Sequence, residues 1–145
     1  METHRTTWNG RPVSAEPPFG STIIVRRSRD ARFEYLLLHR VFTGDEPQGQ
    51  WEWTPPSGAR YPGETIDACA RRELEEETGI DQSPQATAYG SNDWPVFLLE
   101  ADSDTAITLS PEHDRYKWVD LTEAIALCSP KEVASPFERL RRETE

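Results

Sequence analysis

The chain has 145 residues and a formal net charge of −10, with 26 Asp and Glu against 16 Lys and Arg. This length fits one domain with a single core. The acidic balance excludes a general nucleic-acid surface, because such surfaces need an excess of Lys and Arg. The two cysteines imply no disulfide framework, and no apolar run is long enough to span a bilayer. We therefore expect a cytoplasmic protein without a membrane segment, either a monomer or a homodimer.

The chain begins with a polar, proline-containing stretch that lacks periodicity. We expect this stretch, 1–18, to be a flexible segment ahead of a single domain over 19–145. Two β-rich runs follow at 21–27 and 33–41, and the charged residues of 27–30 between them predict a hairpin turn.

A loop is predicted next, over 42–50, from its two Gly and one Pro. Short extended pieces at 51–54 and 57–60 lead into a predicted helix over 65–78, which lacks internal Gly and Pro and is rich in Ala, Glu, Arg and Leu. Gly79 is suited to a left-handed cap and ends this helix.

The second half of the chain predicts three strands and two helices. The strands are expected at 85–89, 95–101 and 116–119, and the helices at 121–128 and from a Ser135-Pro136 cap through Arg142. Strands and helices therefore mix along the chain, which predicts an α/β fold (mixed α+β) with a sheet flanked by helices.

The helix over 65–78 has acidic residues on its predicted core face. Its apolar stripe consists of Ile66, Cys69, Ala70 and Leu74. Glu73, Glu76 and Glu77, related as i, i+3 and i+4, continue this stripe and do not lie opposite it. The outward face is already supplied by other residues, namely Ala68, Arg71 and Glu75.

Like charges at this spacing repel, and the C-terminal end of a helix dipole disfavours anions further. A cation must therefore compensate. Clustered carboxylate oxygens suit a hard divalent ion such as Mg²⁺, which also takes phosphates and waters as ligands. The alternative is a solvated acidic helix face without a metal.

Two glycines precede this helix. Gly58 and Gly63 flank a loop with Pro62, and such a loop brings backbone N–H groups close to a phosphate chain. The alternative is an ordinary tight turn into the helix.

The segment from Gly58 to Ile80, GARYPGETIDACARRELEEETGI, resembles the signature of the Nudix hydrolases. The resemblance implies an α/β/α sandwich with a mixed central sheet and hydrolysis of nucleoside diphosphates linked to another moiety. It implies Mg²⁺ as cofactor, with Mn²⁺ as a substitute, and a nucleotide-type small molecule as substrate. Glu73, Glu76 and Glu77 would be metal ligands, with Gly58 also assigned to the metal site. Glu64 would be a further ligand or a neighbour of the ligands. Arg72 would be the ion-pair partner that orients a carboxylate, with an ordinary surface arginine as the alternative.

Two flanking segments resemble the diadenosine polyphosphate hydrolase branch of that family. They are WTPPSG at 53–58 and EHDRYKW at 112–118. By this resemblance Glu112 is a metal ligand or general base, and Tyr116 stacks on a base. Core packing is the alternative for Tyr116. The substrate-binding set is Trp53, Ser57, Gly58, Arg60 and Tyr116, and Trp51 and Trp118 are further aromatic candidates for a base pocket.

The chain also departs from that branch. Ser57 stands where the branch has Lys, and the segment 92–95 lacks a second Lys. Arg60, Arg40 or His39 are the substitutes to test, although each also fits a structural role. Pro95 resembles a position used by ADP-ribose pyrophosphatases.

The function predicted from these patterns is Mg²⁺-dependent water attack at phosphorus, with Glu77 or Glu112 as general base and Glu76 in the catalytic set. A dinucleoside polyphosphate is one substrate. Alternatives are a nucleoside triphosphate or ADP-ribose pyrophosphatase and, in another class, a non-catalytic nucleotide-binding module.

Overall fold

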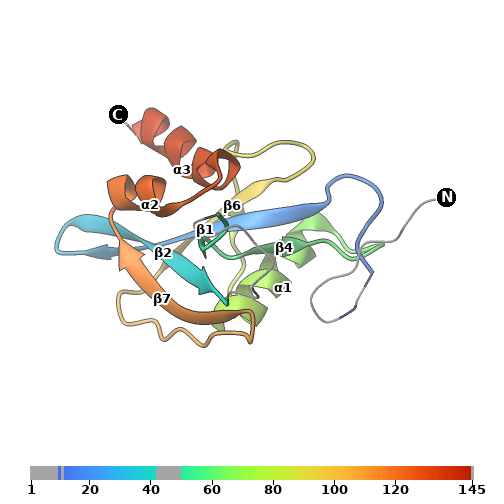
Figure 1. Cartoon of the computed structure of the whole chain (residues 1–145), viewed down its shortest axis with the longest axis horizontal. Coiled ribbons are helices and arrows are strands. Elements are labelled where there is room, and N and C mark those ends of the chain that lie inside the picture. The colour runs from blue at the N-terminus through green and yellow to red at the C-terminus, as the bar shows by residue number, and fades with distance from the viewer. Residues whose placement is uncertain (1–9, 11, 42–49, 145) are drawn as a thin grey trace.

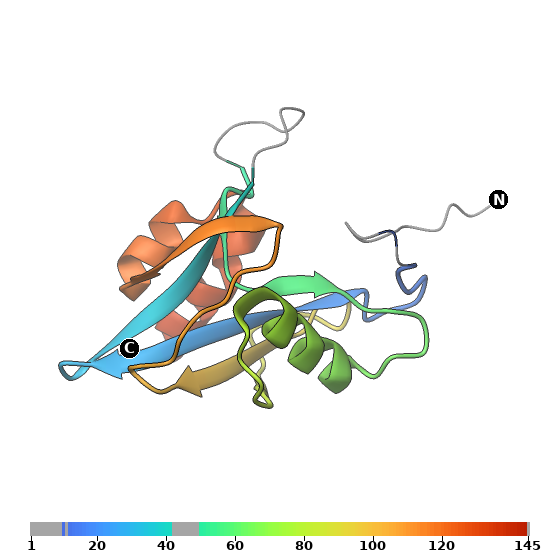
Figure 2. The same cartoon turned by 90° about the horizontal axis from the view of Figure 1, so that it is seen from below.

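A mixed β-sheet crosses the middle of the molecule, with one helix on one face and two on the other (Figures 1 and 2). The structure is a computed structural model and describes residues 10, 12–41 and 50–144. The expected loop over 42–50 lies outside these residues apart from Gln50. The layers confirm the predicted α/β class with a sheet flanked by helices.

The sheet has seven strands within the described residues. They are β1 (Gly20–Arg29), β2 (Arg32–Arg40), β3 (Trp53–Thr54), β4 (Ser57–Ala59), β5 (Gln85–Ala86), β6 (Val96–Ala101) and β7 (His113–Val119). The central order is β3-β2-β1-β6-β5, with β4 paired to β1 and β7 paired to β2. β1 and β6 are parallel and the other pairs antiparallel, so the sheet is mixed as expected.

The hairpin between β1 and β2 turns later than predicted. Arg27 still lies on the strand, where its Nε donates to Glu34 Oε1 at 2.8 Å. The turn residues are Asp30 and Ala31, with φ of 53° and 64°. Two-residue hairpins favour positive φ at both central positions because this matches the strand twist. The charged residues before Asp30 are therefore strand residues, and the predicted turn at 27–30 was wrong in position.

Helix α1 (Ile66–Thr78) forms as predicted. The Thr65 side chain accepts a hydrogen bond from the Ala68 N–H and caps its start, and Gly79 ends it with φ of 78°. The side chains of Cys69, Ala70 and Leu74 are buried against the sheet, while Ile66 is half-buried.

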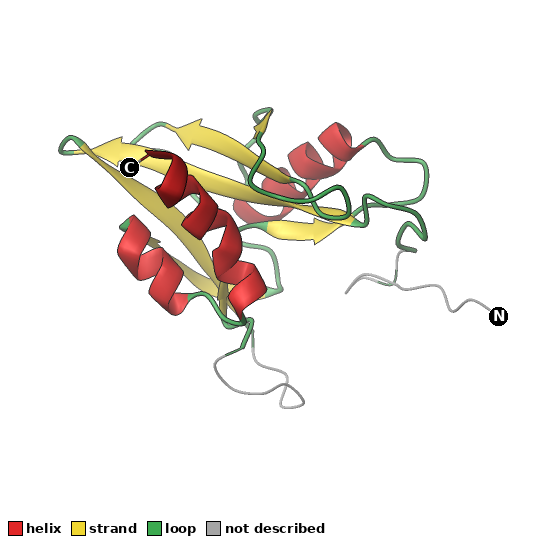
Figure 3. Ribbon diagram, turned by 90° about the horizontal axis from the view of Figure 1, so that it is seen from above, coloured by secondary structure: helices red, strands yellow, loops and turns green. Residues whose placement is uncertain are grey.

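Helices α2 (Leu121–Leu127) and α3 (Lys131–Thr144) cover the opposite face (Figure 3). The predicted Ser135-Pro136 cap was wrong, because Pro136 lies inside α3. Val133, Phe137 and Leu140 are all buried, so the apolar stripe begins before the proline. Burial of this stripe outweighs the hydrogen bond that a proline removes.

Alternate residues along the strands belong to two separate hydrophobic cores, one on each face of the sheet. On β2, Leu36 and Leu38 face α1, while Tyr35 and Leu37 face α2 and α3. Strand β7 also starts earlier than the predicted 116–119. None of the helices in the described ranges has the length and apolar character needed to cross a membrane.

Candidate metal centre and adjoining pocket

The C-terminal half of α1 carries the predicted carboxylates to β4. Glu73 and Glu77 are buried, with 6 % and 5 % of their surface exposed, whereas the Glu76 side chain is 41 % exposed. The Ser57 N–H donates to Glu77 Oε1 at 3.0 Å. Two of the three carboxylates therefore continue the buried stripe of the helix, and Glu76 lies at its solvent edge.

Gly58 leaves the space that Glu73 occupies. A Cβ built on Gly58 would lie 2.1 Å from Glu73 Cδ and 2.2 to 2.3 Å from both carboxylate oxygens. A side chain at this position would displace the Glu73 carboxylate. The structure thus gives the first glycine of the segment a steric role beside this carboxylate, whereas sequence reasoning had assigned it to phosphate or metal contact.

Arg72 holds the loop and the helix together. Its Nε and Nη2 donate to the two oxygens of Glu64 at 2.7 and 2.8 Å, and Nη2 also donates to the Ala59 carbonyl at 2.9 Å. Its Nη1 donates to Glu73 Oε1 at 2.7 Å. The guanidinium also stacks over Tyr61, with its Cζ 3.7 Å from the ring centroid. Arg72 thus contacts both Glu64 and Glu73, and its role in orienting a metal-binding carboxylate stays a prediction.

The electrostatics of this site disfavour ionised carboxylates. Burial, reinforced by repulsion from Glu76 and Glu112, raises the pKa of Glu73 to about 7, despite the attraction of Arg72. Burial and the neighbouring Glu73 also raise the pKa of Glu77 well above its usual value. Burial raises the pKa of Glu112 as well, against the nearby Arg40. These groups gain from a cation that neutralises them.

Strand β7 and the turn before it add two more groups to the carboxylates of α1. One donor atom each of Glu77, Glu112 and His113 lies within 4.8 Å of the others. His113 is buried, and burial lowers its pKa to about 4, so its ring is neutral at pH 7. Its Nδ1 makes no hydrogen bond to any described residue.

This donor set fits a divalent cation. Glu77, Glu112 and the neutral imidazole of His113 converge, and the buried Glu73 lies close enough to interact electrostatically with Glu77 and Glu112. Carboxylate oxygens are ligands for Mg²⁺ and Mn²⁺, and imidazole is a ligand for transition ions. Glu64 has both oxygens engaged by Arg72, so its role as a metal ligand stays a prediction.

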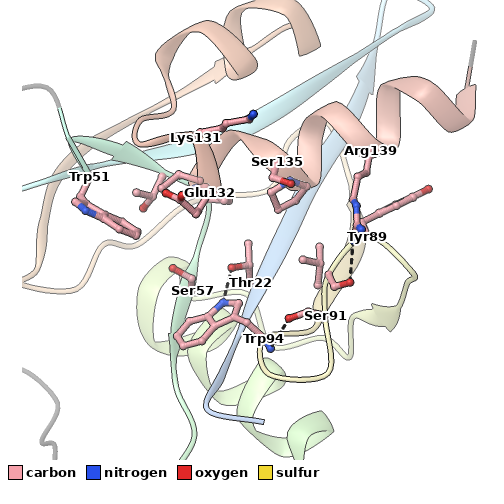
Figure 4. Close-up of a pocket in the computed structure, with 16 residues that line it drawn as sticks. Thr22, Trp51, Ser57, Tyr89, Ser91, Trp94, Lys131, Glu132, Ser135 and Arg139 are labelled. Atoms are coloured by element: carbon pink, nitrogen blue, oxygen red, sulfur yellow. Dashed lines mark hydrogen bonds between the residues drawn. The ribbon is translucent and has the colours of Figure 1, made fainter. Parts of the chain in front are cut away.

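A cavity of about 580 Å³ adjoins this centre on the other side of β4 (Figure 4). Thr22 and Ser57 are cross-strand partners, and both line the cavity. In Figure 4, Trp51 lies at one end, Tyr89 and Arg139 lie at the other, and Trp94 lies across from α3. The Ser57 N–H contacts Glu77, so one residue joins the cavity to the carboxylates.

Other predicted substrate residues lie outside this cavity. Arg60 donates to the carbonyl oxygens of Pro18, Glu16 and Glu64 and to Ser14 Oγ, so its guanidinium fixes the segment that precedes β1. Its part in substrate binding stays a prediction.

Trp53 and Tyr116 lie on opposite faces of the sheet. Trp53 packs edge-on against His39, with ring centroids 4.8 Å apart, and Lys117 Nζ lies 4.5 Å from the Trp53 ring centroid. Tyr116 pairs with Leu38 on the α1 face and is 41 % exposed. The structure therefore separates these two candidates for a base platform.

Sequence reasoning missed several residues that the structure brings to this region. They are His113 at the carboxylates and Tyr89, Trp94, Lys131 and Arg139 at the cavity. Trp94 was considered only as part of the segment 92–95 that lacks a Lys, and Pro95 also for its resemblance to ADP-ribose pyrophosphatases. The available signal was Trp94, a bulky aromatic residue directly before Pro95 and the start of β6. For Lys131 and Arg139 there was none, because both look like ordinary charged residues of an amphipathic helix.

Comparison with known proteins gives consistent results for family and fold. A family model described as the NUDIX domain matches residues 17–140. The chain is 31 % identical over 128 residues to bis(5'-nucleosyl)-tetraphosphatase (asymmetrical) of Mus musculus, covering 79 % of this chain and 83 % of that protein.

Two solved structures share the fold. A binary complex of the C. elegans Ap4A hydrolase superposes with a TM-score of 0.68 at 23 % identity, over 86 % of this chain and 96 % of the other. The MutT protein of Methanosarcina mazei Go1 gives a TM-score of 0.64 at 27 % identity, over 91 % and 99 %.

Proposed function

This chain belongs to the NUDIX domain family, and from that premise we propose that it is a pyrophosphohydrolase acting on a dinucleoside polyphosphate. The reaction is cleavage of a phosphoanhydride bond in a nucleoside diphosphate linked to another group, with Mg²⁺ or Mn²⁺. The observation that carries the proposal is the buried carboxylate cluster placed against a nucleotide-sized cavity. Cavities of roughly 300 to 1,000 Å³ hold small-molecule ligands, and this one has about 580 Å³.

The carboxylates supply the metal site and the base. Glu73, Glu76 and Glu77 would hold the ion, with Arg72 keeping Glu73 in place. When bound, Mg²⁺ supplies positive charge at the diphosphate and favours water attack at phosphorus. Glu112 is either a further metal ligand or the general base that accepts the proton of the attacking water, and its raised pKa suits proton transfer near neutral pH.

The cavity supplies binding of the nucleoside. Trp51, Tyr89 and Trp94 give it aromatic surface on which a base can stack. Trp51 has a φ of 61°, a conformation that costs a bulky residue roughly 1 to 3 kcal/mol and is concentrated at functional sites. The backbone thus presents the indole to the cavity at some cost in stability.

Cations of α3 compensate for the two lysines that the sequence lacks. Lys131 and Arg139 line the cavity, and Arg139 Nη1 donates to the Gly90 carbonyl at 2.9 Å. In an acidic protein these charges attract the polyphosphate chain or the second phosphorylated half of the substrate. This placement favours a substrate with charged groups at both ends over one with a single short triphosphate.

A substrate panel with Mg²⁺ and Mn²⁺ tests the proposal. It contains dinucleoside polyphosphates, nucleoside triphosphates, ADP-ribose and nucleotide sugars, and cleavage in ¹⁸O-labelled water identifies the phosphate attacked. The proposal expects the highest kcat/KM for a dinucleoside polyphosphate. A preference for triphosphates or ADP-ribose would show that the substrate belongs to another class. Binding without phosphate release across the panel would show that the protein is not a hydrolase of these compounds.

Two pocket variants test the location of the substrate. Trp51→Ala and Arg139→Ala are expected to raise KM about tenfold with kcat retained within about threefold, because they remove binding remote from the reacting phosphate. Arg142→Ala on the same helix lies outside the cavity lining and serves as the matched control. An unchanged KM in both pocket variants would place the nucleoside elsewhere.

A further inference from the structure

His113 differs from the other buried histidine of this region. Both ring nitrogens of His39 have carboxylate partners, with Nδ1 2.7 Å from Asp114 Oδ1 and Nε2 3.0 Å from Glu52 Oε2. His113 is 8 % exposed, yet its Nδ1 has no hydrogen-bond partner in the described part of the chain. A buried polar atom left in this way costs about 1 to 3 kcal/mol, and a bound ion is a partner that would remove this cost.

A bulge in β7 brings His113 to the α1 face. His39 pairs with Arg115, but the next residue, Arg40, pairs with His113, so Asp114 is an extra residue on β7. Asp114 reaches His39 on the face of α2 and α3, while a His113 ring nitrogen lies within 4.8 Å of the carboxylate oxygens of Glu77 and Glu112. Bulges beside active sites re-aim side chains in this way.

We propose that His113 is a nitrogen ligand, together with Glu77 and Glu112, in a mixed nitrogen and oxygen site that prefers Mn²⁺ or another first-row transition ion over Mg²⁺. The preference follows from ligand chemistry, because Mg²⁺ takes oxygen ligands whereas imidazole suits transition ions. The inference rests on the proposed metal-dependent function, and it adds to that function a ligand and a metal preference.

The charges of the neighbouring residues favour a cation that binds this site more tightly than Mg²⁺ does. The charge of Arg40 acts on both Glu112 and His113. An incoming ion therefore meets partial repulsion, which a nitrogen donor offsets only for ions that bind imidazole well. Glu76 repels both Glu77 and Glu112 and favours occupation of the site.

The test is pulsed electron paramagnetic resonance of Mn²⁺ bound to the full chain without nucleotide, which detects ¹⁴N coupling from a coordinated imidazole. The matched pair of variants is His113→Gln and His39→Gln, because both histidines are buried and only one faces the carboxylates. We expect ¹⁴N coupling in the wild type and in His39→Gln and its loss in His113→Gln. The Mn²⁺ affinity of His113→Gln should fall about tenfold or more, with a change below about twofold for Mg²⁺.

Bound Mn²⁺ without ¹⁴N coupling in the wild type would overturn the proposal, and this result does not depend on the folding of any variant. Persistence of the coupling in His113→Gln would do the same. Hydrolysis with Mg²⁺ is measured separately, so a chain that cleaves its substrate but shows no nitrogen coupling refutes this inference alone. A chain that binds Mn²⁺ through nitrogen but cleaves nothing refutes the proposed function alone.

Discussion

Replacing Glu73 by Gln should stabilise the metal-free protein in a pH-dependent way. Glu73 is 6 % exposed, and burial raises its pKa from 4.5 to about 7. Since one pKa unit corresponds to about 1.36 kcal/mol, this rise amounts to roughly 3 kcal/mol. Gln keeps the shape and the oxygen that accepts from Arg72, but it never carries the charge.

The sign follows from proton binding. Below pH 4.5 Glu73 is neutral in both the folded and the unfolded chain and contributes nothing. Between pH 4.5 and about 7 the unfolded chain ionises while the folded one keeps its proton, so the free energy of unfolding falls as pH rises. Above pH 7 the whole loss of about 3 kcal/mol is present, and Glu73→Gln removes it.

The assay is urea unfolding in EDTA between pH 5 and pH 8. The stability of Glu73→Gln minus that of the wild type should grow from roughly 0.8 kcal/mol at pH 5 to about 3 kcal/mol at pH 8. Glu75→Gln is the matched control, because Glu75 is exposed on the same helix. A difference between Glu73→Gln and wild type that stays constant with pH would refute the burial argument.

Three other substitutions test the neighbouring contacts. Arg72→Ala leaves buried carboxylates without a partner and should cost about 3 to 5 kcal/mol in urea unfolding, against less than about 1 kcal/mol for the exposed Arg71→Ala. Gly58→Ala forces Glu73 out of its place and should weaken Mg²⁺ binding about tenfold or more in calorimetry. An unchanged Kd would show that the position of Glu73 beside Gly58 does not matter for metal binding. Glu76→Gln should abolish turnover with stability changed by less than about 0.5 kcal/mol, because this side chain is exposed, and near-wild-type activity at saturating Mg²⁺ would remove it from the ligand set.

Helix α1 and its carboxylates were predictable because the residues that determine the helix are close together in the sequence. The helical period sets which face Glu73 and Glu77 share with Leu74, and Thr65 and Gly79 cap the ends. A helix of this kind depends on residues three or four positions apart, and the sequence displays them directly. The same reasoning predicted Glu73, Glu76 and Glu77 on the buried face; two of them are buried, whereas the Glu76 side chain is 41 % exposed.

The cavity and the His113 site were not predictable in this way. Trp51, Tyr89 and Arg139 come from three distant segments that meet only through the order of the strands. His113 reaches the carboxylates because one extra residue on β7 reverses the alternation of side chains, and a bulge has no composition signal of its own. Arg60 was assigned by charge alone, although its donors hold the segment before β1.

The stability of this fold and its metal binding are linked through the same side chains. Holding Glu73 ionised and buried costs roughly 3 kcal/mol, and Glu77 adds to this cost in the same direction. A ligand that binds only the folded state at 100 times its Kd stabilises the fold by about 2.7 kcal/mol. Metal at that level therefore offsets about one buried carboxylate. With a metal ion bound, the acidic chain would offer a positive site to a polyanion at the place where its own charges are least stable, and β4 itself carries no basic residue.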